Sequence, residues 1–334
     1  MIARSQRKIE PESWQRDLRE AWTNPLAMLA HLRIDPARAG FDPAAMADFR
    51  FRVPRAFAGL IRPGDPADPI LRQVLPIAAE TLPALGFASD PVGDAASERA
   101  PGLLHKYQGR ALLLLTGACA VHCRYCFRRE FPYAQSVGSQ RLEAALEVIA
   151  ADTTLEEIIL SGGDPLVQDD GRLAALARGL AAIPHLRRLR VHSRLPVTLP
   201  ARLTPALFDW LTGTRLTPVL VLHANHPREL SPEFERAIGS FRHGNVTLLN
   251  QAVLLRGVND DAETLAELSI RLFECGILPY YLHALDRVRG AGHFEVPEQE
   301  AGMLLDALRN RLPGYLVPKL VREVAGAASK LPVP

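Results

Sequence analysis

The chain has 334 residues, of which 48% are hydrophobic and 23% are charged, and its formal net charge is +2. A chain of this length and composition can bury a substantial core, as one large domain or as two of ordinary size. The near balance of charge gives no electrostatic indication of nucleic acid or a membrane surface as a partner. Four cysteines are too few for a disulfide framework, and the first residues lack the apolar segment of a signal peptide. We therefore expect a cytoplasmic protein whose thiols are reduced or bind metal.

The first hundred residues are predicted to form a mainly helical region that ends in a linker. Residues 13–22 and 25–32 have apolar side chains at helical spacing, and frequent prolines interrupt the pattern as far as residue 83. The stretch "GFASDPVGDAASERAPG", residues 86–102, is rich in Gly, Pro, Ser and Asp, as boundary loops often are. We place this N-terminal region at residues 1–100.

From residue 110 onward, short apolar runs alternate with amphipathic helical stretches. The predicted strands span residues 111–116, 157–161, 188–193, 218–224, 247–255 and 277–285. The predicted helices lie near residues 140–151, 171–183, 203–212, 230–242 and 262–275. Continuous apolar runs suit strands that are buried on both faces of a parallel sheet. The pattern predicts an α/β fold with six β/α units in residues 101–296, followed by a C-terminal segment at residues 297–334.

Polar residues gather just past the ends of these predicted strands. They are Ser161, Gly162, Gly163 and Asp164; His192, Ser193 and Arg194; His223, Asn225 and His226; Gln251; and Asp286. Ligands of parallel α/β sheets and barrels bind beyond the carboxyl ends of the strands. We therefore expect the functional site at this edge of the sheet.

Three of the four cysteines, Cys119, Cys123 and Cys126, lie within eight residues after the first predicted strand. A zinc site or three reduced thiols is the simplest interpretation, but structural zinc takes four ligands. The candidates for a fourth ligand, Cys275, His122 and His105, have no telling spacing, and Cys275 is expected to be a small buried residue at a helix end. An iron–sulfur cluster usually has four thiolate ligands, so three would leave one iron open to a substrate or cofactor.

The spacing C-x₃-C-x₂-C, with Tyr125 between the last two cysteines, resembles the signature of the radical S-adenosylmethionine (SAM) enzymes. The resemblance implies a partial (β/α)₆ TIM-like barrel and a [4Fe–4S] cluster on the three cysteines. It also implies that the turn "SGGDP", with Gly162, Gly163 and Asp164, contacts S-adenosylmethionine. The other residues that we expect to contact a cofactor at this edge are His192, Arg194, His223 and Gln251.

Longer stretches are similar to the lysine 2,3-aminomutase family, among them "HKYQGRALLLLTGACAVHCRYCFRRE", "NQAVLLRGVNDD" and "PYYLHALDRVRGAGHF". The C-terminal end resembles the branch that makes β-lysine for modification of elongation factor P. The resemblance implies an isomerase that uses pyridoxal phosphate beside the cluster to convert L-lysine to β-lysine. It also implies an electron donor and a functional link to elongation factor P and its lysyl ligase, without nucleic acid or membrane as a partner. It leaves a homo-oligomer open.

Specific site residues follow from the same resemblance. Lys330, in "GAASK", matches the lysine that carries pyridoxal phosphate, and Lys106, Tyr107 and Arg110 are assigned to the pyridoxal ring and phosphate. Arg128 matches the arginine that binds the substrate carboxylate, and Asp286 and Glu323 match the two acids that bind its distal ammonium. Without the resemblance, these side chains would be read as solvated charges or ordinary salt bridges.

Several alternatives stay open at this point. Relatives with a longer C-terminus bind zinc through additional cysteines, but this chain stops at Pro334, and we expect no zinc. Arginine and glutamate 2,3-aminomutase are alternative activities. Two acids in the pocket argue against glutamate, whereas a guanidinium would still pair with them. A binding module that keeps the fold without catalysis is the alternative from another class of protein.

Overall fold

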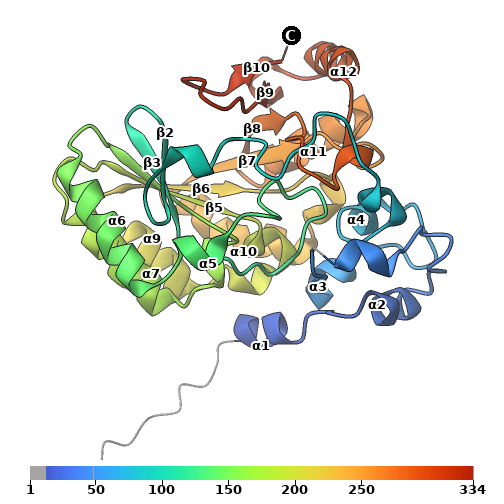
Figure 1. Cartoon of the computed structure of the whole chain (residues 1–334), viewed down its shortest axis with the longest axis horizontal. Helices are drawn as coiled ribbons and strands as arrows, with labels where there is room; N and C mark the ends of the chain where they lie inside the picture. Colours follow the sequence, from blue (N-terminus) through green and yellow to red (C-terminus); the bar gives the residue numbers. More distant parts are fainter. Residues whose placement is uncertain (1–12, 48, 334) are drawn as a thin grey trace, which may run out of the picture.

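The structure is a computed structural model that describes residues 13–47 and 49–333. A ten-stranded sheet lies at its centre, with the strands side by side in chain order (Figure 1). The seven strands from the third to the ninth run parallel, and antiparallel pairs close the two edges. The strands are β1 (Glu98–Ala100), β2 (Leu103–Tyr107), β3 (Arg110–Leu114), β4 (Glu157–Ser161), β5 (Arg188–Ser193), β6 (Thr217–Leu222), β7 (Thr247–Val253), β8 (Leu278–His283), β9 (Lys319–Arg322) and β10 (Leu331–Pro332). A parallel sheet wound in chain order is the arrangement of a (β/α) barrel, left open here, and the predicted fold class is confirmed.

The helices connect the parallel strands. In Figure 1 the helices α6, α7, α9 and α10 lie together on one side of the sheet. The helices are α1 (Ser13–Arg19), α2 (Pro25–His31), α3 (Arg55–Ala58), α4 (Pro69–Arg72), α5 (Tyr133–Ser136), α6 (Ser139–Ala151), α7 (Asp170–Ala181), α8 (Leu195–Thr198), α9 (Pro205–Thr212), α10 (Pro232–His243), α11 (Ala262–Glu274) and α12 (Glu298–Arg311). Within the described part of the chain, no helix combines the length and the apolar character that crossing a membrane requires.

Local sequence accounts for where the main helices begin. Thr204, Ser231 and Asp261 precede α9, α10 and α11, and each side chain accepts a hydrogen bond from the backbone N–H three residues later. Such caps satisfy backbone donors that a helix start leaves without partners. Proline at the first position of α9 and α10 already has a helical φ angle. The predicted helix positions are therefore confirmed to within a few residues.

The structure contains one more parallel strand than the sequence predicted. The strand β9 follows α12 and pairs with β8, so the C-terminal segment contributes a seventh parallel strand. Its four residues, "KLVR", are too short to stand out as an apolar run. The edge strands β1 and β2 were also missed, because they lie in and beside the predicted linker. The sheet thus continues across the predicted boundaries at residues 100 and 296, and the three-region division stays a prediction.

The N-terminal region has a hydrophobic core of its own, which packs against the loop that carries the cysteines. Met28, Phe57 and Ile70 belong to this core, together with Val121 from the cysteine loop, and Cys123 packs on its edge. The region therefore covers one side of the cysteine loop. The absence of a signal-peptide pattern concerns a stretch that falls mainly in residues 1–12, outside the described residues.

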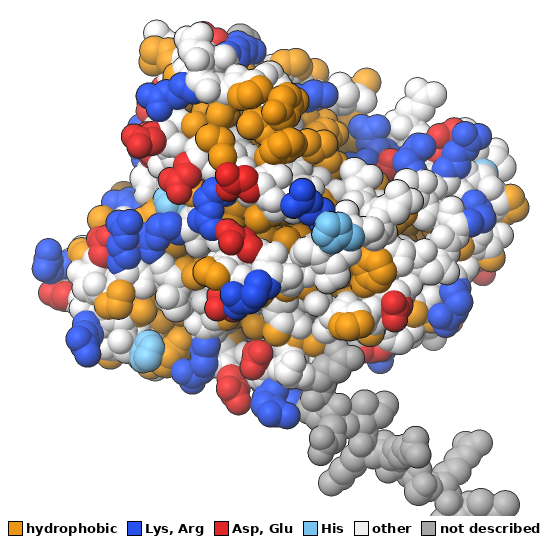
Figure 2. Space-filling model, turned by 180° about the vertical axis from the view of Figure 1, so that it is seen from behind, with side chains coloured by type: hydrophobic (Ala, Val, Ile, Leu, Met, Phe, Trp, Pro, Cys, Tyr) orange, Lys and Arg blue, Asp and Glu red, His pale blue; other side chains and the backbone are white. Residues whose placement is uncertain are grey.

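The face in Figure 2 carries basic and acidic side chains in mixture, together with a group of apolar ones. Among the described residues, Ile270, Phe273 and Tyr315 are large apolar side chains that stay exposed, and the rings of Phe273 and Tyr315 lie 5.2 Å apart. The mixture of charges agrees with the near-zero net charge of the chain.

Candidate active site

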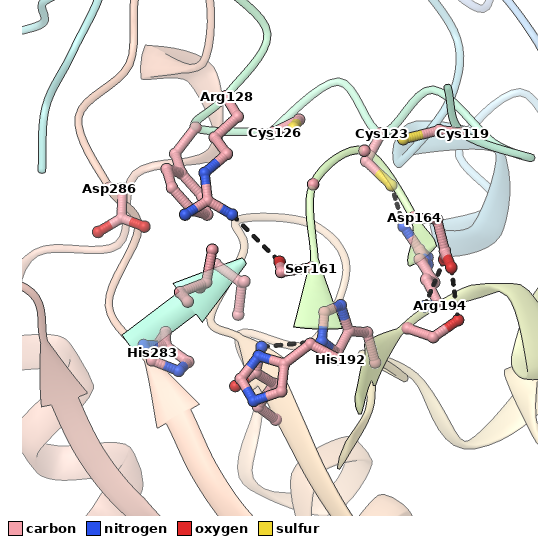
Figure 3. A pocket seen from close by; sticks show the side chains of 18 of the residues that line it. Cys119, Cys123, Cys126, Arg128, Ser161, Asp164, His192, Arg194, His283 and Asp286 are labelled. Atoms are coloured by element: carbon pink, nitrogen blue, oxygen red, sulfur yellow. Dashed lines mark hydrogen bonds between the residues drawn. The ribbon is translucent and has the colours of Figure 1, made fainter. Parts of the chain in front are cut away.

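A cavity of about 620 Å³ opens beyond the carboxyl ends of the parallel strands. Its size is that of a pocket for small molecules. It is lined by every residue that the sequence predicted to bind a metal, a cofactor or a substrate: Cys119, Cys123, Cys126, Lys106, Tyr107, Arg110, Arg128, Gly162, Gly163, Asp164, His192, Arg194, His223, Gln251, Asp286, Glu323 and Lys330. Figure 3 shows the cysteines along one side and Asp286 and His283 across from them. The structure brings these residues together in one cavity, and the functional site and the individual roles stay predictions.

The cysteine loop, residues 116–129, is held from behind by the N-terminal region. The guanidinium of Arg124 is fully buried and pairs with Glu80 at 2.6 Å. It also donates to the carbonyl oxygens of Ala45 and Phe49. The backbone N–H of Arg124 donates to the carbonyl of Gln73 at 2.9 Å. The loop is therefore fixed in place by protein contacts.

The thiols form an electrostatically coupled group. Burial raises the pKa of Cys119 well above its ordinary value, and the charge of Cys126 adds to the effect. Burial also raises the pKa of Cys126 to about 11, and the charge of Cys123 contributes. Three partly buried thiolates this close together repel one another unless a positive centre joins them, and a coordinated thiol loses its proton. The donor set thus fits a cationic iron–sulfur cluster.

The three residues considered as a fourth metal ligand beside the three loop cysteines lie in different parts of the structure. Cys275 is buried in the hydrophobic core at the end of α11, as expected. His105 lies on β2, 3.7 Å from Asp152. His122 lines the cavity, and its Nδ1 contacts the carbonyl oxygen of Arg50 at 2.9 Å. Among residues 13–47 and 49–333, no three His, Cys, Asp or Glu side chains gather as ligands of a single metal ion.

The two glycines after β4 are explained by the close approach of two backbone segments. Gly162 has a φ of +133°, and a Cβ there would lie 2.4 Å from the carbonyl oxygen of Thr116. A Cβ on Gly163 would lie 2.4 Å from the carbonyl oxygen of Ala118. Only glycine lets this turn pass so close to the cysteine loop. Contact of the glycines with a cofactor stays a prediction.

Asp164 uses its carboxylate to join the ends of β4 and β5. It accepts hydrogen bonds from the Ser193 hydroxyl at 2.7 Å and from the backbone N–H groups of Arg194, Leu195 and Leu166. Burial raises its pKa, and the hydrogen bond from Ser193 opposes this effect. Asp164 therefore fixes the backbone that carries Arg194.

Arg194 lies directly beside a predicted cluster ligand. Its Nη1 is 2.7 Å from Cys123 Sγ and also donates to the Tyr125 hydroxyl. Its Nη2 contacts Gln73 at 2.7 Å and Glu229 at 3.0 Å. No sequence pattern singles out Gln73 or Glu229, because their roles depend on tertiary contacts alone.

Five side chains form a chain of alternating charge along the cavity wall. Arg128 Nε lies 2.6 Å from Asp94 Oδ2, and Asp94 Oδ1 lies 2.6 Å from Lys106 Nζ. Lys106 Nζ lies 2.7 Å from Glu323 Oε1, and Glu323 Oε2 lies 2.5 Å from Lys330 Nζ. Although burial acts in the opposite direction, Lys330 and Lys106 lower the pKa of Glu323 to about 2. Glu323 is thus ionised, and its carboxylate forms an ion pair with Lys330.

Asp94 is the one of these five charged side chains that the sequence analysis missed. Its side chain is only 2% exposed, yet it lies in the stretch interpreted as a linker. Burial alone would raise the pKa of its carboxyl, but Arg128 and Lys106 lower it. Nothing in the local pattern marks Asp94, because both cations reach it from distant parts of the chain.

Asp286 is a partly buried carboxylate with no contact cation among the described residues. Among the described residues, no hydrogen bond or ion pair involves its side-chain oxygens, and the side chain lines the cavity (Figure 3). Burial, with a contribution from the charge of Glu323, raises its pKa to about 7, although the charges of Lys330 and Lys106 lower it slightly. The cavity therefore offers a vacant anionic position that a ligand ammonium would fill.

The remaining predicted cofactor residues offer hydrogen-bonding groups that are still free. The buried hydroxyl of Tyr107 has no partner, and the guanidinium of Arg110 stacks over the Tyr107 ring at 4.7 Å without an acidic partner among the described residues. Nε2 of His192 is also buried without a partner. Burial lowers the pKa of His192 well below its ordinary value and that of His223 to about 3, so both rings are neutral. Gln251 contacts Nε2 of His223 at 2.8 Å.

Comparison with known proteins gives consistent matches. The family model of the Radical SAM superfamily matches residues 113–269. L-lysine 2,3-aminomutase of Escherichia coli is 49% identical over 326 residues, which cover 96% of this chain and 94% of that protein. The Haemophilus influenzae protein of the same name is 46% identical, with 96% and 95% covered. The one from Clostridium subterminale is 37% identical, with 85% of this chain and 68% of that protein covered. A radical SAM methyltransferase structure from Sphaerobacter thermophilus is a distant likeness, at a TM-score of 0.45 and 18% identity over 66% of this chain and 68% of that one.

Proposed function

The chain belongs to the L-lysine 2,3-aminomutase family of radical SAM proteins, and we propose that its cavity is the active site of an isomerase that converts L-lysine to β-lysine. One observation carries the proposal. The three cysteines, the candidate cofactor lysine Lys330 and the vacant carboxylate of Asp286 all line a single cavity.

Cys119, Cys123 and Cys126 are the residues that would hold the [4Fe–4S] cluster of a radical SAM protein. When bound, the cluster and S-adenosylmethionine supply a radical that removes a hydrogen atom from the substrate. The contribution of this chain is placement, because Arg124 and Glu80 fix the cysteine loop at the cavity wall. His192 lines the same cavity, and its Nε2, which has no partner among the described residues, could form a hydrogen bond to S-adenosylmethionine.

Lys330 is the residue that would hold pyridoxal phosphate. When bound, this cofactor supplies a conjugated system that lets a nitrogen move between adjacent carbons. The unpartnered hydroxyl of Tyr107 and the guanidinium of Arg110 fit the cofactor ring and phosphate. Lys330 Nζ must lose its proton before it can act as a nucleophile, so its ion pair with Glu323 has to open as the cofactor binds.

Two groups would fix the substrate lysine. Arg128 Nη2 has no hydrogen-bond partner among the described residues, and its planar guanidinium suits the α-carboxylate. Asp286 has no contact cation among the described residues and suits the distal ammonium. Glu323 pairs with two lysines, and it becomes available to the substrate once the ion pair with Lys330 has opened. Glutamate as substrate would place a second carboxylate next to these acids.

The partners of the reaction belong to the same proposal. We infer an external one-electron donor, a cytoplasmic location, and use of the β-lysine for the modification of elongation factor P through its lysyl ligase. The support for this branch is the 46–49% identity to the Escherichia coli and Haemophilus influenzae relatives over nearly their full length. The exposed apolar residues Ile270, Phe273 and Tyr315 would suit contact between copies of the chain.

A substrate panel tests the proposed function. The protein is reconstituted without oxygen with iron, sulfide, pyridoxal phosphate, S-adenosylmethionine and a reductant, and is incubated with L-lysine, L-arginine or L-glutamate. Chromatography with mass spectrometry should detect β-lysine, at a rate at least ~100-fold above any reaction of L-glutamate, because like charges placed together cost several kcal/mol.

Two variants serve as controls for the panel. Cys123→Ala should give no product, and Cys275→Ala should behave like the unchanged protein, because Cys275 lies in the core away from the cavity. Product from Cys123→Ala, turnover of glutamate in place of lysine, or no product from any amino acid would contradict the proposed function.

A further inference from the structure

The ammonium group of Lys106 is surrounded by oxygen atoms of the protein. Its Nζ lies 2.9 Å from the carbonyl oxygen of Val92, 2.6 Å from Asp94 Oδ1 and 2.7 Å from Glu323 Oε1. The side chain is 15% exposed. A lysine ammonium has three hydrogens to donate. Val92 and Glu323 accept hydrogen bonds from Nζ, and Asp94 forms an ion pair with it. Two carboxylates therefore already compensate the charge of Lys106, which leaves little attraction for a phosphate group.

Arg110, on the neighbouring strand β3, is in the opposite situation. Its guanidinium has no acidic partner among the described residues and stacks over the ring of Tyr107. The Tyr107 hydroxyl next to it is buried and has no partner within the part of the chain that the structure describes. Arg110 and Tyr107 are thus the two of the three expected cofactor residues whose polar groups are not already paired with a carboxylate.

We propose that Lys106 is a positioning residue, which holds Asp94 and Glu323 in place, and that it is not a ligand of the cofactor phosphate. Asp94 in turn orients Arg128 through Nε, and Glu323 orients Lys330. Lys106 is therefore the central link between the arginine for the substrate carboxylate and the lysine for the cofactor. The proposal deepens the proposed function and rests on it.

Charge explains why this link matters. Asp94 and Glu323 are both largely buried, with side chains that are 2% and 15% exposed. Without Lys106, each of the two carboxylates would lose a contact cation, and Glu323 would be freer to repel the nearby Asp286. The expected defect lies in the geometry of the substrate site, with cofactor binding retained.

Paired variants test the proposal, with Lys106→Met compared with Arg110→Met. The dissociation constant of pyridoxal phosphate is measured by absorbance titration, and kcat and KM for L-lysine are measured separately. Lys106→Met should change the dissociation constant of pyridoxal phosphate less than ~3-fold and raise KM for L-lysine more than ~10-fold. Arg110→Met should raise the dissociation constant of pyridoxal phosphate more than ~10-fold, which is the loss expected for a charged hydrogen bond.

Two further variants protect the test against a folding defect. Lys106→Arg keeps the positive charge, so its KM for L-lysine should return close to that of the unchanged protein. Loss of packing alone would not predict this recovery. Asp94→Asn should raise KM and leave cofactor affinity unchanged, because it weakens the contacts that orient Arg128 and Lys106 and leaves Arg110 and Tyr107 in place. The proposal is overturned if Lys106→Met weakens pyridoxal phosphate as much as Arg110→Met does. Because the titration needs no turnover, this outcome is distinct from failure of the unchanged protein to convert lysine, which would overturn the proposed function instead.

Discussion

At the scale of single residues, Asp286 gives the most specific expectation, because its ionisation should control substrate binding. Its pKa of about 7, raised by burial and then by Glu323, lies far above the ordinary value of 3.8. The carboxylate form, which pairs with the substrate ammonium, predominates above pH 7. KM for L-lysine should therefore fall by up to ~10-fold between pH 6 and pH 8, since one pKa unit is a factor of ten.

The raised pKa of Asp286 also affects folding: substrate binding should improve as pH rises, but the stability of the folded protein should decrease. Between pH 4 and pH 7 the folded protein holds a proton on Asp286 that the unfolded chain has released, so stability without ligand falls as pH rises through this range. Asp286→Asn should remove this loss, which thermal unfolding at pH 5 and pH 8 would show. An unchanged pH dependence of KM and of unfolding in Asp286→Asn would contradict the role assigned to this carboxylate.

Residues were predictable from the sequence where a short motif carries the chemistry. The cysteines stand within eight residues, and the Gly-Gly turn follows a strand, so both were recognisable. Asp94 was not, because its partners Lys106 and Arg128 come from other elements. The contact between Lys106 and Glu323 joins positions 217 residues apart, and no local pattern indicates it. The lack of a hydrogen bond or ion pair at the Asp286 side chain, among the described residues, likewise depends on the folded cavity and cannot be seen in the sequence.

At the scale of elements, the N-terminal helical region supports the cysteine loop. The buried pair of Arg124 and Glu80, with side chains 0% and 1% exposed, is the main polar link between them. Glu80→Gln would leave the guanidinium of Arg124 buried without its counter-charge. Removal of one partner from a buried ion pair costs ~3–5 kcal/mol. We expect a lower melting temperature and poorer retention of the cluster, measured by unfolding and by visible absorbance.

Asp306→Asn is the matched control for this prediction. Asp306 pairs with Arg309 at 2.7 Å on the surface of α12, where the side chains are 69% and 61% exposed. An exposed pair contributes at most ~1 kcal/mol. Equal effects of the two substitutions on unfolding and cluster retention would show that the buried pair has no special role in holding the loop.

Elements were predictable where apolar runs are long. The positions of β4 and β5 agree with prediction at both ends, because their runs are bounded by polar residues. The strands β1, β9 and β10 have four residues or fewer and were missed. Their positions at the sheet edges are set by pairing with neighbours, which a local apolar pattern does not report.

At the scale of the whole molecule, the curved sheet brings the cysteine loop and the segment with Glu323 and Lys330 to the same cavity. The cysteine loop follows β3 near one edge, whereas Glu323 and Lys330 follow β9 and precede β10 at the other. Curvature of the sheet places both on one cavity. The fold class was predictable from the alternation of strands and helices, but the seventh parallel strand β9, which precedes Glu323 and Lys330, was not.

The central claim is that this cavity converts L-lysine through a site in which Asp286 binds the distal ammonium, and the kcat/KM of Asp286→Asn tests it most directly. Loss of one partner of a largely desolvated ion pair costs ~3–5 kcal/mol, so kcat/KM for L-lysine should fall about a hundred- to several-thousand-fold. Cluster and pyridoxal phosphate content should match the unchanged protein, because Asp286 belongs to neither predicted ligand set. Production of β-lysine by Asp286→Asn at the rate of the unchanged protein would contradict the account.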